Sequence, residues 1–195
     1  MNLYRAAVIG CGKPIDTHPG VAAGYRIAYS HGAGYQRTGR AHLVAAADIV
    51  AENAKAYAEH FHVPNVYTDY KEMLKQEKPD LVSICTWPIY HAQMVRDAAE
   101  AGVRGILCEK PMAMNMREVR GMLEACRKHG VVLLVSHQRR YHPLHQFVRQ
   151  AIADGRIGQV TRLEAWVGGG WDMMSWGTHW VDMLRFYLGD PKIKS

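Results

Sequence analysis

The chain has 195 residues, of which 48% are hydrophobic and 22% charged, a composition typical of a globular protein rather than of a disordered one. Its net charge of +6 suits an anionic ligand, but no run of about five or more lysines and arginines points to nucleic acid. No stretch of about 18 apolar residues predicts a membrane span. The first residues lack the apolar region of a signal peptide, so we expect a cytoplasmic protein.

Short apolar runs alternate with helical patterns along the first part of the chain. The runs predict strands at residues 6–9, 42–48, 81–86, 105–108 and 131–135. The patterns between them predict helices around residues 25–31, 51–61, 92–101 and 116–129, the last capped by Asn115 and ended by Gly130. Nearly all-apolar strands separated by helices indicate an α/β fold with a doubly wound parallel sheet. Ligands of such sheets bind beyond the carboxyl ends of the strands.

The pattern changes after about residue 138. Phe147, Val148, Ala151 and Ile152 predict a short amphipathic helix, followed by a turn at 154–158. Residues 160–167 alternate like a half-exposed strand, and another helix is predicted near 177–188. We therefore predict a first domain over residues 1–138 and the start of a second α/β domain over residues 139–195.

The sequence Gly10-Cys11-Gly12 closes the first predicted strand. Glycines at this point let the backbone approach a pyrophosphate, whose charge is stabilised by the N-terminus of the next helix. The third glycine of this motif would fall at residue 15, which is Ile15. Gly24 could take the third role after an insertion of about nine residues. The alternative is a tight turn between a strand and a helix, with no ligand.

Asp48 ends the second predicted strand. A carboxylate at this place can accept hydrogen bonds from both ribose hydroxyls of an adenosine, and it would repel a 2′-phosphate. The following residues, Ile49 and Val50, offer no arginine for such a phosphate. This favours NAD over NADP. The alternative is an aspartate that caps a helix.

Glu109-Lys110-Pro111 follows the strand predicted at 105–108. A lysine at the carboxyl end of a strand can reach a bound substrate and donate a hydrogen bond to its hydroxyl or carbonyl oxygen. The proline fixes the backbone and could be cis. The alternative is a surface salt bridge within a turn.

Four of the five tryptophans lie between residues 166 and 180. In the same region His179 and Asp182 are three residues apart, so they would share one face of a helix. A histidine titrates near neutral pH and suits proton transfer, and tryptophan rings such as Trp176 suit stacking on a sugar. The alternative is an aromatic helix that packs on a sheet, with His179 merely hydrogen-bonded.

The cysteines and the paired histidines predict no metal site. Cys11, Cys85, Cys108 and Cys126 form no C-x-x-C pair, and we expect buried free thiols. The pairs at 60/62 and 142/145 lack a carboxylate or cysteine at a supporting spacing, so we expect solvated or capping histidines.

Taken in order, several stretches resemble the Gfo/Idh/MocA family, the relatives of glucose–fructose oxidoreductase and inositol dehydrogenase. The matching stretches are A-V-I-G-C-G, L-V-A-A-A-D, V-Y-T-D-Y-K-E-M-L, D-L-V-S-I-C-T, I-L-C-E-K-P-M-A, Q-R-R-Y-H-P and G-T-H-W-V-D. The resemblance implies a Rossmann domain followed by a C-terminal α/β domain with an open, mostly antiparallel sheet. It also implies hydride transfer between NAD(P) and a hydroxyl of a sugar, cyclitol or related polyol.

The resemblance also implies roles for individual residues. Lys110 matches the lysine that orients and polarises the reacting oxygen, and His179 matches the histidine usually assigned to proton transfer. Trp176 and Asp182 are candidate substrate contacts. The residues expected at the cofactor are Gly10, Cys11, Gly12, Gly24, Asp48, Thr86, Trp87, Pro88, His91, Glu109 and Lys110.

The sequence departs from the family pattern in three places. The glycine loop is interrupted, Ser175 stands where the family commonly has an aspartate four residues before the histidine, and the chain stops at Ser195. We expect a truncated C-terminal sheet, which if complete could form a homo-oligomer. Two alternatives stay open, an NAD-dependent glycosidase-type enzyme that uses transient oxidation and a catalytically silent dinucleotide-binding module.

Overall fold

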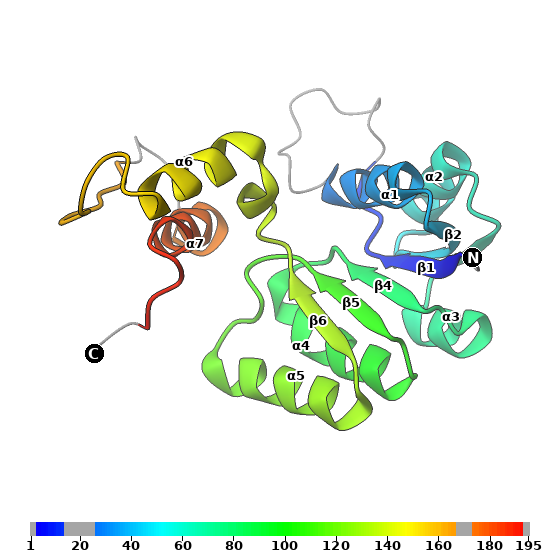
Figure 1. Ribbon diagram of the computed structural model, residues 1–195. Helices are drawn as coiled ribbons and strands as arrows, with labels where there is room; N and C mark the ends of the chain where they lie inside the picture. The colour runs from blue at the N-terminus through cyan, green and yellow to red at the C-terminus, as the bar shows by residue number, and fades with distance from the viewer. Residues whose placement is uncertain (1–2, 14–25, 167–172, 193–195) are drawn as a thin grey trace. The chain divides into compact units, whose positions relative to one another are not determined.

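The computed structural model describes residues 3–13, 26–166 and 173–192 of the chain (Figure 1). The chain divides into two compact units, Met1–Val135 and Ser136–Ser195. The first unit is built around a parallel sheet, and the described part of the second unit is helical and irregular.

The sheet of the first unit has six parallel strands in the order β3-β2-β1-β4-β5-β6. The strands are β1 (Tyr4–Ile9), β2 (Ala41–Ala47), β3 (Asn65–Tyr67), β4 (Leu81–Ile84), β5 (Gly105–Cys108) and β6 (Val132–Val135). The strand order reverses between β1 and β4, which is the topological switch point where ligands bind in sheets of this type. This confirms the predicted doubly wound fold.

Helices cover both faces of the sheet (Figure 1). The helices of the first unit are α1 (Ile27–Thr38), α2 (Ala51–Phe61), α3 (Tyr70–Glu77), α4 (Pro88–Glu100) and α5 (Met116–His129). One core packs α1 and α2 on the sheet around Tyr57 and Phe61. The other packs α3, α4 and α5 around Val95 and Met122. Because both faces of the central strands are buried, these strands are apolar at nearly every position.

The ends of α5 follow the predicted capping pattern. The side-chain oxygen of Asn115 accepts the Glu118 N–H at 3.0 Å, and the Glu118 carboxylate accepts the Met114 N–H at 2.9 Å. Gly130 then ends the helix in the left-handed conformation at φ +68°. The cap therefore satisfies amide groups that the first turn of a helix leaves without partners.

The second unit contains η2 (Gln138–Tyr141), α6 (Pro143–Ala153), η3 (Met173–Gly177) and α7 (Thr178–Tyr187). The strand predicted over residues 160–167 is wrong, because residues 160–166 are irregular and most of them are exposed. A strand needs a hydrogen-bonded neighbour, and none of the described residues after Val135 forms one.

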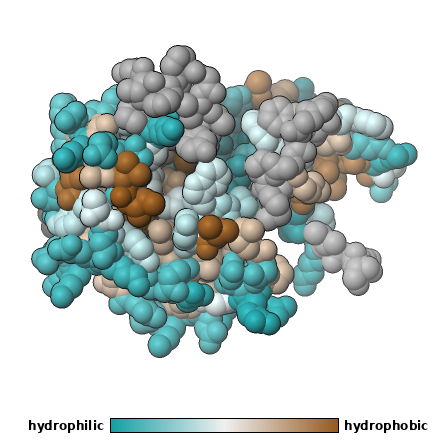
Figure 2. All heavy atoms as spheres, turned by 180° about the vertical axis from the view of Figure 1, so that it is seen from behind, coloured by the Kyte–Doolittle hydropathy of each residue, from teal (hydrophilic) through white to brown (hydrophobic). Residues whose placement is uncertain are grey.

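The surface carries both hydrophilic and hydrophobic side chains. On the face shown in Figure 2, hydrophilic groups dominate and the hydrophobic groups lie in separate places. Within the described residues, no helix combines the length and apolar character needed to cross a membrane.

Candidate functional site

The turn after β1 is shaped by two glycines in the left-handed region. Gly10 has φ +83° and Gly12 has φ +69°. A Cβ atom on Gly10 would lie 2.7 Å from Thr86 Cγ2 and 3.0 Å from the main-chain carbon of Cys85. Only glycine therefore lets the end of β1 approach the end of β4 this closely. Gly24, the candidate third glycine, lies outside the described residues.

Asp48 ties this turn to the end of β2. Its Oδ2 accepts the N–H of Cys11 at 2.9 Å and the N–H of Gly12 at 3.2 Å. Its Oδ1 accepts the Val50 N–H at 2.9 Å and lies 3.5 Å from the side-chain nitrogen of Asn53. The N-cap of α2 is Val50, so the alternative that Asp48 caps this helix is wrong. The structure instead places a carboxylate directly on the glycine turn.

Cys11 takes part in the turn through its main chain. Its side chain is fully buried, and its Sγ donates to the carbonyl of Ala47 at 3.6 Å. Burial, and then the charge of Asp48, raise the pKa of the thiol. Burial, and then the charge of Glu109, likewise raise the pKa of Cys108 to about 12. Cys11, Cys108 and Cys126 are buried free thiols, as predicted, whereas Cys85 is a free thiol that is only partly buried, so the prediction of burial is wrong for Cys85.

The segment after β4 brings Thr86, Trp87 and Pro88 to the same edge of the sheet, where Pro88 begins α4. Trp87 is 60% exposed. His91, in the first turn of α4, is fully buried, and its two ring nitrogens each lie 3.0 Å from a carbonyl oxygen, of Thr86 and of Pro111. His91 therefore cross-links the segments that follow β4 and β5.

The end of β5 carries Glu109 and Lys110, with a cis peptide between Lys110 and Pro111. Glu109 is only 6% exposed, so the alternative of a surface salt bridge does not describe this pair. One Glu109 oxygen lies 3.0 Å from His31 Nε2, and the other accepts the Lys110 N–H at 3.2 Å. Lys110 is half-buried at the carboxyl edge of the sheet.

His31 is a residue that the sequence interpretation missed. It lies on the buried side of α1 with Ala28 and Tyr29, and it is 8% exposed. The available signal was a histidine on the apolar stripe of a helix that follows the glycine turn.

The second unit holds the other predicted residues, His179, Trp176 and Asp182. His179 lies in the first turn of α7 and is 6% exposed, with its ring centroid 6.0 Å from that of Trp176. The guanidinium of Arg139 stands over Trp176 at 5.7 Å and over Trp180 at 4.8 Å. Trp176 therefore already has a cation over its ring.

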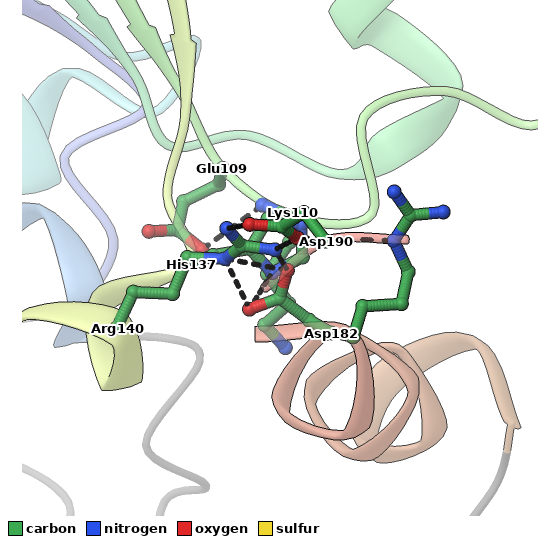
Figure 3. Close-up of polar contacts among 7 residues, drawn as sticks. Glu109, Lys110, His137, Arg140, Asp182 and Asp190 are labelled. Carbon is green, nitrogen blue, oxygen red and sulfur yellow. Dashed lines mark hydrogen bonds and ion pairs between the residues drawn. The ribbon is translucent and has the colours of Figure 1, made fainter. Parts of the chain in front are cut away.

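Asp182 and Asp190 both pair with Arg140 (Figure 3). Arg140 Nε donates to Asp182 at 2.8 Å, and its two terminal nitrogens donate to Asp190 at 2.9 and 2.7 Å. Asp182 is 9% exposed. Hydrogen bonds from Arg140 hold the pKa of Asp190 below its usual value. These contacts make Asp182 a structural partner of η2.

Of the histidines expected to be solvated or capping, His142 is a cap, whereas His145 instead links α6 to α7. His142 accepts the Leu144 N–H at 3.3 Å and caps α6, and His145 Nδ1 lies 2.6 Å from the hydroxyl of Tyr187. In the part of the chain that the structure describes, no three His, Cys, Asp or Glu side chains gather to hold a metal ion.

Residues 4–137 match the sequence model of the GFO_IDH_MocA family, described as an oxidoreductase family with an NAD-binding Rossmann fold. The chain belongs to the Gfo/Idh/MocA oxidoreductase family. This match covers the whole sheet, the glycine turn and Lys110.

Individual relatives are similar over almost the whole chain. D-apiose dehydrogenase of Paraburkholderia graminis is 30% identical, over 96% of this chain and 50% of its own length. D-glucoside 3-dehydrogenase of Escherichia coli is 31% identical, over 98% of this chain and 56% of its own length. The chain thus spans about half the length of these curated relatives.

Solved structures of related dehydrogenases share the fold. The WlbA dehydrogenase of Bordetella pertussis, in complex with NADH and UDP-GlcNAcA, superposes with a TM-score of 0.78 at 27% identity. The superposition covers 96% of this chain and 59% of the WlbA chain.

Proposed function

We propose that this protein is an NAD-dependent oxidoreductase that transfers hydride between the nicotinamide ring and a hydroxyl-bearing carbon of a sugar, cyclitol or related polyol. The observation that carries the proposal is the position of Asp48 on the Gly10–Gly12 turn, at the switch point of a sheet whose next strands present Thr86 and Lys110 at the same edge. The names of the related dehydrogenases support the substrate class.

The residues of this edge fit a dinucleotide. A side chain at Gly10 would collide with Thr86, so the turn is formed by bare backbone. A bare backbone turn at this place lets a pyrophosphate approach closely. Four groups donate to the Asp48 carboxylate, and the side-chain nitrogen of Asn53 is the most distant of them. A ribose hydroxyl would therefore most readily replace Asn53 as the donor to Asp48 Oδ1. The negative charge of Asp48 would repel a 2′-phosphate and so favours NAD over NADP. Bound NAD supplies the hydride acceptor at its nicotinamide ring.

Lys110 is proposed to bind and polarise the reacting oxygen. Its ammonium group can donate a hydrogen bond to a hydroxyl or carbonyl and stabilise the negative charge that develops there. His179 is proposed to accept or return the hydroxyl proton, as a neutral imidazole can near neutral pH. Trp176 and Asp182 are proposed to lie beside the substrate. Asp182 is kept in place by the hydrogen bond that it accepts from Arg140.

The test is a substrate panel. The purified chain is incubated with NAD⁺ and, in parallel, NADP⁺ and with sugars, cyclitols and glycosides, while NADH absorbance and product mass are followed. The expected result is an oxidised polyol together with an equal amount of NADH. The rate is expected to be higher with NAD⁺ than with NADP⁺. Tight NADH binding without turnover on any compound would identify a silent binding module. Release of a sugar from a glycoside without net NADH would identify a glycosidase-type reaction.

Lys110→Ala tests the residue assigned to the chemistry. Because it removes the donor that faces the reacting oxygen, kcat is expected to fall about 10²–10⁴-fold, while the affinity for NADH, measured by calorimetry, stays within a few-fold. Lys75→Ala, an exposed lysine in α3, is the matched control and is expected to keep wild-type turnover. Turnover of the Lys110 variant within a few-fold of wild type would contradict the assignment.

A further inference from the structure

Four side chains of the first unit form a continuous chain of hydrogen bonds that ends next to Lys110. The hydroxyl of Tyr35 lies 2.9 Å from Ser83 Oγ, and Ser83 Oγ lies 2.9 Å from His31 Nδ1. His31 Nε2 lies 3.0 Å from a Glu109 oxygen. The other oxygen of Glu109 accepts the backbone N–H of Lys110.

The chain of groups is buried and crosses between distant parts of the sequence. His31, Ser83 and Glu109 are 8%, 0% and 6% exposed. They come from α1, from β4 and from the end of β5. Burying a carboxylate away from water is unfavourable unless hydrogen bonds are donated to it. His31 Nε2 is placed to supply such a bond to one Glu109 oxygen, while the Lys110 N–H donates to the other.

With His31 neutral, one arrangement of protons satisfies the three side-chain contacts between Tyr35 and Glu109. Tyr35 donates to Ser83, Ser83 donates to His31 Nδ1, and His31 Nε2–H donates to the Glu109 carboxylate. Ser83 then fixes both the tautomer and the ring orientation of His31. In this arrangement one Glu109 oxygen is held by His31, and the other is left to receive the Lys110 amide.

We propose that His31 is a positioning residue for Lys110. By anchoring one oxygen of Glu109, it fixes the side-chain torsions of Glu109, and the second oxygen then holds the main chain of Lys110 at the end of β5. The hydrogen bond to the Lys110 amide lies entirely within the first unit. The consequence for turnover rests on the proposed function, in which Lys110 polarises the substrate oxygen.

Two substitutions of His31 separate its two contacts. The amide oxygen of asparagine can take the place of His Nδ1, so His31→Asn retains an acceptor for the Ser83 hydroxyl and loses the contact to Glu109. The amide nitrogen of glutamine falls near the place of His Nε2, so His31→Gln retains the donor to Glu109. Tyr35→Phe removes the hydroxyl farthest from Glu109 and serves as the control.

The decisive measurement is hydrogen exchange of the Lys110 amide by NMR in the whole chain, which requires no substrate. His31→Asn is expected to accelerate this exchange about five- to tenfold, because the acceptor of the amide is no longer held. His31→Gln and Tyr35→Phe are expected to stay within about twofold of wild type. Unchanged exchange in folded His31→Asn would overturn the proposal. So would equal acceleration in both His31 variants together with the other β5 amides, since that indicates general loosening.

If His31→Asn does not fold, Glu109→Gln replaces it, because the amide keeps the shape of the side chain and weakens the acceptor. Faster Lys110 exchange in Glu109→Gln supports the proposal, and wild-type exchange overturns it. On a polyol oxidised by the wild type, His31→Asn is further expected to lower kcat about tenfold with KM and NADH affinity unchanged, and His31→Gln to restore it. If no polyol is oxidised, the proposed function fails, while the exchange result still decides the role of His31.

Discussion

At the scale of single residues, Gly10 and Gly34 give opposite expectations for the same substitution. Gly10→Ala adds a Cβ atom 2.7 Å from Thr86 Cγ2 at a backbone φ of +83°, and is expected to cost about 1–3 kcal/mol of unfolding free energy and to weaken NADH binding. Gly34→Ala lies in α1 with open space around the new Cβ, and is expected to stabilise by up to about 1 kcal/mol.

Urea unfolding and NADH calorimetry of both variants check this expectation. A Gly10→Ala protein as stable as wild type, with unchanged NADH affinity, would show that the turn relaxes and that its shape is not needed for the cofactor.

The candidate site was predictable where a residue follows a recognisable strand. Gly10, Asp48 and Lys110 could be located because apolar runs mark the strands and the carboxyl ends of parallel strands share one edge. His31 and Arg140 could not be, because their contacts join segments far apart in sequence. Asp182 could be assigned to a helical face, but its pairing with Arg140 could not be read from spacing.

At the scale of secondary-structure elements, the cap of α5 is the clearest local determinant. Asn115→Ala removes the acceptor of the Glu118 N–H and the donor to the Glu118 side chain, and is expected to cost about 1 kcal/mol and lower Tm by about 2–4 °C. Asn115→Ser keeps an acceptor at the N-cap and is expected to recover most of this loss. Thermal unfolding followed by circular dichroism measures both, and equal Tm values for the alanine and serine variants would argue against the cap.

Elements that lack a long apolar pattern were the ones that the sequence did not reveal. β3 has only three residues and none is buried, and α3 follows it directly, so neither was predicted. The opposite error occurred at residues 160–167, where an alternating pattern predicted a strand without a partner. Alternation describes a half-buried surface, and only neighbouring strands turn it into a sheet.

At the scale of the whole molecule, Arg140 with its partners Asp182 and Asp190, the Arg140 cluster, makes the free energy of unfolding depend on pH. Because Arg140 lowers the pKa of Asp190 in the folded chain below its unfolded value near 3.9, the stabilisation is present above about pH 4 and is lost as the pH falls through the folded pKa. Asp190→Asn is therefore expected to have a lower Tm than wild type at pH 6–7, and the difference should shrink as the pH approaches 3.

Thermal scans from about pH 3 to pH 7 check this dependence. Asp154→Asn, an exposed aspartate outside the Arg140 cluster, is the control and is expected to keep a constant difference from wild type. A constant difference for Asp190→Asn as well would mean that its ion pair contributes nothing to stability.

The strand order also decides when the cofactor edge can form during synthesis. β1 pairs with β2 on one side, but its other neighbour, β4, does not begin until Leu81, and Lys110 comes later still. A nascent chain that has reached α3 therefore presents β1 with one edge unpaired, and parallel pairing across such a sequence separation is slow. The glycine turn is thus among the first parts of the site to be synthesised and among the last to be completed.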